Sequence, residues 1–255
     1  FDATGWWARS GILDLLKPHG GPPTFPPGGV GDHASAMTLF GAIMMSLYQR
    51  EKTGEGRYVS TSLLANGCWA NGMSLQGAIA GFDLGGILDK KGYRSPFSMV
   101  YKTRDECYII FVLTNPAREW PQVASCLGHP EWVEDERFSD IAAIMKQRGL
   151  VRGMFADVIL SKNLADLCLS LDEQNLTYSA IEKISDVVQD AHLIENEIII
   201  KTGSSNPEYQ WTVANPIVVH GEDKKAPADP PEVGEHSREI LAEVGFKESD
   251  IEKLL

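Results

Sequence analysis

The sequence predicts an α/β protein, in which amphipathic helices alternate with short strands. The longest helical pattern covers residues 32–52, where apolar side chains recur every three or four positions and so share one helix face. Residues 97–113 contain two strand-like runs and predict a hairpin that turns at 104–106. Breaks that contain several glycines or prolines, at 81–95 and 227–231, are the expected linkers between parts of this fold.

The other elements follow from the same two periodicities and from helix stop signals. Asn163 is placed to cap the helix that follows it. Helices are predicted at residues 1–16, 64–80, 117–127, 140–159, 164–174, 184–190 and 235–244. Further strands are predicted at residues 58–63, 178–181, 198–201 and 210–219.

Composition limits the classes of function. The chain has 255 residues, of which 43% are hydrophobic and 23% charged, as in ordinary globular domains. A net charge of −12 argues against a nucleic-acid-binding protein, which needs a basic face, although one local basic pocket is enough for an anionic ligand. No apolar run approaches the roughly 20 residues that cross a bilayer, so no membrane partner is expected.

The cysteines and the first residue lead to expectations about the thiols and about the start of the chain. The four cysteines include no C-x-x-C pair and no histidine at metal-site spacing, which predicts reduced thiols in a cytoplasmic protein and no metal site. The sequence opens at Phe1 without a methionine, which indicates an N-terminally truncated chain.

Asp32 is the candidate functional residue, because it stands where a glycine-rich loop becomes the long helix. One interpretation is a helix N-cap, a position that aspartate favours. The other is a catalytic carboxylate, because the positive helix end stabilises both an ionised nucleophile and an oxyanion formed beside it. Gly28, Gly29 and Gly31 fit neither a P-loop nor a dinucleotide-binding fingerprint, because no lysine has the required spacing and no strand precedes them.

Several motifs resemble those of the family III CoA-transferases, a group that also includes the α-methylacyl-CoA racemases. The most specific are Gly31-Asp32 and, after the long helix, Thr53-Gly54-Glu55-Gly56. The resemblance extends in order along the whole chain. Its other segments are residues 1–11, 101–105, 128–138, 215–217 and 234–246.

The resemblance implies the architecture. Relatives begin with a Rossmann-like half that carries much of the CoA-binding surface, and they form interlocked homodimers. Residues 1–80 would then be part of the large domain with the catalytic helix, and 81–95 a linker. A small α/β domain would occupy 96–205, and a C-terminal segment at 206–255 would return to the large domain.

The resemblance also implies the chemistry. In the transferases, the residue that matches Asp32 attacks an acyl-CoA to give a mixed anhydride and then an aspartyl-CoA thioester. In the racemases, the matching aspartate exchanges a proton with a histidine, which would fall at Phe1, and a glutamate would fall within residues 114–116. Position 1 is not a histidine and residues 114–116 include no glutamate, so a transferase is favoured.

The expected site therefore consists of Asp32 as catalytic residue, with Phe1, Asp2, Gly31, His33 and Asn115 as residues that bind the substrate or CoA. The expected substrates are an acyl-CoA and a carboxylic acid, with no permanently bound cofactor. Two alternatives stay open. One is an acyl-CoA racemase or epimerase, and the other is a catalytically incompetent fragment that acts only as a folded interaction unit.

Overall fold

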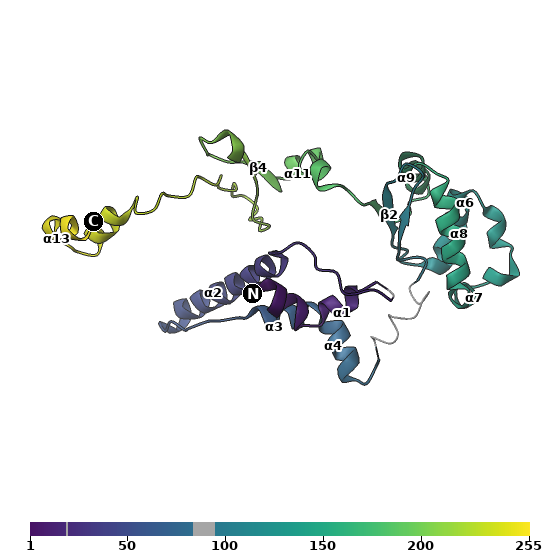
Figure 1. Ribbon diagram of the computed structural model, residues 1–255, viewed down its shortest axis with the longest axis horizontal. Coiled ribbons are helices and arrows are strands. Elements are labelled where there is room, and N and C mark those ends of the chain that lie inside the picture. Colours follow the sequence, from purple (N-terminus) through teal and green to yellow (C-terminus); the bar gives the residue numbers. More distant parts are fainter. Residues whose placement is uncertain (19, 84–94) are drawn as a thin grey trace. The chain divides into compact units, whose positions relative to one another are not determined.

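The computed structural model describes residues 1–18, 20–83 and 95–255 (Figure 1). The chain divides into two compact units, Phe1–Ile181 and Glu182–Leu255. The α/β class is confirmed, because helices are combined with a three-stranded sheet and a two-stranded sheet. Most of the linker predicted at 81–95 lies outside the described residues, and the predicted domain boundaries stay predictions.

Residues 1–83 form helices and loops, with no strand among those described. Each of the two helices predicted at residues 1–16 and 64–80 is divided into two shorter helices. Gly11 separates the first pair with a φ of 82°, a left-handed conformation that glycine adopts without strain. The elements are η1 (Asp2–Ala8, a π-helix), α1 (Ile12–Leu16), α2 (Val30–Thr53), α3 (Leu63–Ala70) and α4 (Gly72–Ile79).

The strand predicted at residues 58–63 is wrong. The segment is extended but pairs with no other strand of the described chain, and Tyr58 is exposed. Alternation of apolar and polar side chains shows that a segment can form a strand. The strand forms only where a neighbouring strand supplies hydrogen-bond partners for its backbone N–H and C=O groups. Ser62 instead ends the segment as the N-cap of α3, accepting the N–H of Ala65 at 3.1 Å.

Small residues allow η1 and α3 to pack closely. A Cβ atom added to Gly67 would collide with the carbonyl oxygen of Trp6 and the Cβ of Ser10. Asn71, which follows α3, donates from Nδ2 to the carbonyl oxygen of Ser10 at 3.0 Å. The side chains of Trp6 and Trp7 in η1 are buried. Gly67 therefore serves the close packing of η1 on α3.

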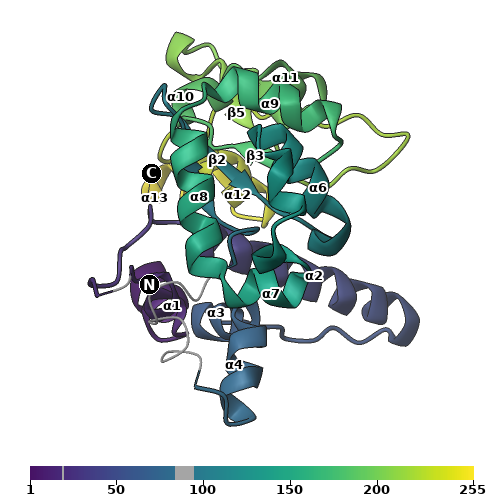
Figure 2. The same ribbon diagram turned by 90° about the vertical axis from the view of Figure 1, so that its right-hand side faces the viewer.

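Residues 95–181 contain the predicted hairpin. Strands β1 (Val100–Lys102), β2 (Tyr108–Phe111) and β3 (Tyr178–Ala180) form an antiparallel sheet in that order, with Ile109 opposite both Tyr101 and Ala180. Figure 2 shows helices of this part around the sheet, and α8 packs on β1. The helices are α6 (Pro116–Leu127), α7 (Ile141–Lys146), α8 (Arg148–Leu160) and α9 (Leu164–Glu173), with short 3-10 turns at Pro130–Val133 and Glu136–Phe138.

Asn163 is the N-cap residue of α9, as predicted, but its side chain makes no capping hydrogen bond in the described part of the chain. Its Oδ1 accepts a hydrogen bond from Nε of Arg104 at 3.0 Å. The cap comes from Asp105 in the hairpin turn, whose two carboxylate oxygens each lie 3.2 Å from the N–H of Leu164. The hydroxyl of Thr103 donates to the same carboxylate at 2.6 Å, and this bond is the main reason that the pKa of Asp105 is lowered.

The second unit is small and mostly exposed. Its strands β4 (Ile199–Lys201) and β5 (Trp211–Val213) pair antiparallel, within the two strands predicted there. Its helices are α10 (Ile184–Val187), α11 (Ala191–Glu195), α12 (Ser237–Glu243) and α13 (Glu248–Leu254), with a 3-10 turn at Pro207–Tyr209. Among all described residues, no helix is both long and apolar enough to cross a membrane.

Candidate active site

Asp32 is the third residue of α2 and lies on its exposed surface. Its predicted role as N-cap is wrong, because its side chain makes no capping hydrogen bond with any described residue. The N-cap is Gly29, whose φ of 90° turns the chain into the helix at Val30, two residues earlier than the pattern suggested. The carboxylate of Asp32 is therefore not committed to capping the helix on which it stands.

Asp2 performs the capping from another segment. Its Oδ2 accepts the N–H of Gly29 at 2.7 Å, and its Oδ1 accepts the N–H of Gly31 at 3.1 Å. Asp2 is only 8% exposed and belongs to η1, 27 and 29 residues earlier in the chain. A carboxylate at the N-terminus of a helix also complements the positive end of the helix dipole.

Gly31, which directly precedes Asp32, is enclosed between two side chains of η1. A Cβ atom at this position would overlap Oδ1 of Asp2 and the indole ring of Trp6. The hydrogen bond from its N–H to Asp2 and the close contact with Trp6 therefore both hold the backbone of Gly31 in place.

A pair of glycine-to-alanine variants tests this contact. Gly31→Ala should lower the free energy of unfolding by about 1–3 kcal/mol, because the added methyl group forces Asp2 or Trp6 to move. Gly41→Ala lies on the same helix, where a methyl group meets no described atom within 4 Å, and should raise stability by about 0.5–1 kcal/mol. Urea unfolding of both variants measures the difference, and equal stabilities would contradict the enclosed position of Gly31.

The first turn of α2 also supplies backbone donors. The N–H of Gly31 is occupied by Asp2, so it is not available to an oxyanion. Within the described chain, the N–H groups of Val30 and Asp32 have no recorded acceptor. Such groups at a helix N-terminus bind anions and stabilise negative charge that develops beside them. Asp32 therefore stands as an exposed carboxylate beside unused N–H donors.

CoA-transferase family III matches residues 1–237 of the chain. The chain belongs to this family. It is 24% identical over 251 residues to the (R)-2-hydroxy-4-methylpentanoate CoA-transferase of Clostridioides difficile, an alignment that includes 98% of the chain and 62% of that protein. It is 28% identical over 258 residues to the succinyl-CoA:glutarate CoA-transferase of Mus musculus, with 97% and 57% covered.

Solved structures confirm the fold of this family III chain. The crystal structure of a CAIB/BAIF family protein from Brucella suis superposes with a TM-score of 0.75 at 20% identity. The superposition includes 93% of the chain and 61% of that protein. The chain thus spans only about 57–62% of the length of these relatives.

Of the remaining predicted site residues, two are exposed and one caps a helix. Phe1 is 99% exposed and His33 is exposed on α2. Asn115 is the N-cap of α6, where its Oδ1 accepts the N–H of Arg118 at 3.3 Å. The structure thus joins Asp2 and Gly31 directly, and it gives Asn115 a capping role.

Glu119 is a buried carboxylate that the sequence analysis did not single out. Its Oε2 accepts the N–H of Asn115 at 3.0 Å, and its Oε1 accepts the hydroxyl of Thr114 at 3.3 Å. Together with the Asn115 cap, this reciprocal pair resembles a capping box. An Asn-Pro dipeptide followed by a glutamate in the first turn was the available sequence signal.

Among the described residues, no group of three histidine, cysteine or acidic side chains is arranged so that it could hold a metal ion. The four cysteines, all of which lie in the described parts of the chain, form no disulfide with one another. Burial, the largest cause, raises the pKa of Cys126 to about 11, which keeps this thiol protonated at neutral pH.

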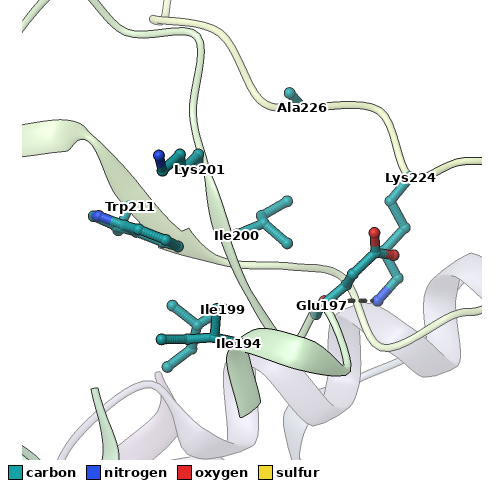
Figure 3. Close-up of a pocket in the computed structure, with 8 residues that line it drawn as sticks. All are labelled: Ile194, Glu197, Ile199, Ile200, Lys201, Trp211, Lys224 and Ala226. Atoms are coloured by element: carbon teal, nitrogen blue, oxygen red, sulfur yellow. Dashed lines mark hydrogen bonds between the residues drawn. The ribbon is translucent and has the colours of Figure 1, made fainter. Parts of the chain in front are cut away.

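The second unit contains a cavity of about 270 Å³ between α11 and the β4–β5 hairpin (Figure 3). Nζ of Lys224 donates to the carbonyl oxygen of Glu197 at 2.9 Å, and Nζ of Lys201 lies 5.5 Å from the centroid of the Trp211 ring. The cavity is smaller than the roughly 300–1,000 Å³ of typical ligand sites. Both ammonium groups already have partners, so the cavity offers no evident reactive group.

Proposed function

We propose that the protein containing this chain transfers CoA from an acyl-CoA to a carboxylic acid, with Asp32 as the nucleophile. The observation that carries the proposal is the exposed carboxylate of Asp32 in the first turn of α2, in a chain that belongs to the family III CoA-transferases. A carboxylate is a competent nucleophile toward an activated acyl group.

The reaction has four balanced steps. The carboxylate of Asp32 attacks the thioester carbonyl, which forms a mixed anhydride and releases CoA thiolate. The thiolate attacks the aspartyl carbonyl, which gives an aspartyl-CoA thioester and frees the donor acid. The acceptor carboxylate then attacks this thioester to form a second mixed anhydride, and the released thiolate attacks its acyl carbonyl. The products are the new acyl-CoA and a regenerated Asp32.

The described residues contribute to these steps through charge and hydrogen bonding. Each attack places negative charge on a carbonyl oxygen, and the N–H groups of Val30 and Asp32 are the local donors suited to hold it. Beside the carboxylate of Asp2, the same N–H groups are the part of the α2 N-terminus left to stabilise the ionised Asp32 and the thiolate. The glycine-rich loop before the helix lets a thioester approach the backbone.

The substrate class is a carboxylic acid of moderate size. The relatives named above act, by their names, on a branched 2-hydroxy acid and on a dicarboxylic acid, both of which present a free carboxylate as acceptor. The proposal includes a homodimer in the cytoplasm, as the family resemblance implies. It includes no permanently bound cofactor.

The sequence disfavours the racemase alternative. Phe1 occupies the position of the expected proton-exchanging histidine, and a phenyl ring carries no exchangeable proton. Asn115 stands within the segment where a racemase would place a glutamate, and an amide is not a general base at neutral pH. The interaction-unit alternative predicts a protein that forms no covalent adduct with any acyl-CoA.

Trapping tests the proposal. The full-length protein is incubated with 2-hydroxyacyl-CoA or succinyl-CoA in the presence of hydroxylamine, which captures an activated aspartate as its hydroxamate. We expect peptide mass spectrometry to locate the modification at Asp32 and at no other carboxylate, because only an acylated or CoA-bound carboxylate reacts. Transfer activity with an unmodified Asp32 would contradict the proposed mechanism.

A further inference from the structure

We infer that Asp2 is a positioning residue that holds the backbone on which the nucleophile stands, an inference that rests on the proposed role of Asp32. Asp2 was expected to bind substrate or CoA. Its two carboxylate oxygens instead accept the N–H groups of Gly29 and Gly31, at 2.7 and 3.1 Å.

The contacts place this restraint next to the reacting group. Gly31 is bonded covalently to Asp32, so any shift of the Gly31 peptide moves the Cα of the nucleophile. The same peptide is confined sterically, because Gly31 lies against Oδ1 of Asp2 and the Trp6 ring. Asp2 is 8% exposed, whereas Asp32 is exposed, so one carboxylate is used inside the fold and the other is left for reaction.

This arrangement differs from an ordinary helix cap. A cap normally comes from the residue that begins the helix, whereas Asp2 reaches α2 from a separate π-helix. The loop between them includes left-handed Gly29, which alone would leave the start of the helix free to move. Two hydrogen bonds to a buried carboxylate restrict that freedom, and a displacement of about 1 Å in a reacting group can cost 10²-fold in rate.

The test compares Asp2→Ala and Asp2→Asn in the full-length protein. Asp2→Ala removes both acceptors and should lower kcat about 100-fold while KM changes less than about threefold, because positioning is lost and substrate contacts remain. Asp2→Asn keeps one carbonyl oxygen as acceptor and should lower kcat about tenfold. Hydrogen exchange of the Gly29 and Gly31 amides should be faster in both variants.

Asp140→Asn is the matched control. Asp140 also caps a helix, with Oδ1 accepting the N–H of Ala143 at 2.8 Å at the start of α7, and it belongs to neither the loop nor α2. Its kcat should stay within about twofold of wild type. A kcat for Asp2→Asn that equals that of Asp140→Asn would overturn the inference, and so would a loss confined to KM. If Asp2→Ala does not fold, the comparison of Asp2→Asn with Asp140→Asn alone decides the test.

The outcomes separate this inference from the proposed function. If Asp32→Asn keeps full transfer activity, the proposed function fails. If Asp32→Asn is inactive and both Asp2 variants keep the wild-type kcat, only the positioning role of Asp2 fails. A graded loss from asparagine to alanine at position 2, with faster exchange at Gly31, supports both.

Discussion

Asp32→Asn should abolish CoA transfer, with a loss in kcat of at least about 10³-fold, because an amide oxygen is a poor nucleophile toward a thioester. The variant should fold normally, since Asp32 makes no capping hydrogen bond with a described residue. Loss of its charge near the helix end should cost only about 0.3–1 kcal/mol of stability. Initial rates of acyl-CoA formation and a urea unfolding curve measure the two quantities.

Thr38→Ala provides the control on the same helix. Thr38 is exposed on α2, and its hydroxyl only bonds back to the carbonyl oxygen of Ala34, so this variant should keep wild-type activity. Asp32→Glu adds a finer comparison, because it retains a carboxylate and displaces it by one methylene. We expect Asp32→Glu to be nearly as inactive as Asp32→Asn. Substantial transfer by Asp32→Asn would remove Asp32 from the mechanism.

Phe155→Ala should destabilise the sheet-containing part by about 3–5 kcal/mol, because the ring is 1% exposed and its removal leaves a large cavity. The ring contacts other aromatic side chains at centroid distances of 6.0–6.1 Å, namely Phe97, Tyr101, Trp120 and Trp132. Urea unfolding followed by tryptophan fluorescence measures the loss.

Leu160→Ala is the matched control for that measurement. Leu160 ends the same helix, α8, but is 51% exposed, so its truncation should cost less than about 1 kcal/mol. Similar costs for the two variants would show that the aromatic cluster around Phe155 is not the main hydrophobic core of residues 95–181.

The sequence predicted residues 95–181 more successfully than residues 1–83. Two strand-like runs predicted the hairpin of β1 and β2, and the structure confirms it, with Tyr101, Ile109 and Phe111 buried. The strand predicted at 58–63 failed because its pattern was local, whereas pairing depends on a distant backbone. Local patterns are reliable where a segment packs on neighbours in sequence.

The sequence carries only part of the information on the candidate site. The family resemblance singled out Asp32 as the catalytic candidate, a role that stays a proposal, and the glycine content of the preceding loop was visible in the sequence. The capping group could not be predicted, because Asp2 lies 27 residues before Gly29 and no periodicity links them. Asn115 and Glu119 show the converse case, because their helix cap is formed by residues close together in the sequence. The predicted substrate contact of Asn115 stays a prediction.

The long-range hydrogen bonds of Asp105 affect the order in which residues 95–181 fold. One carboxylate ties the hairpin turn to the first turn of α9, 59 residues later, and the N–H of Arg104 donates to the carbonyl oxygen of Lys162 at 2.8 Å. Contacts at such sequence separation carry a loop-closure cost and slow folding. We therefore expect the hairpin and the α8–α9 pair to become ordered together, as one cooperative unit, rather than in the order of the chain.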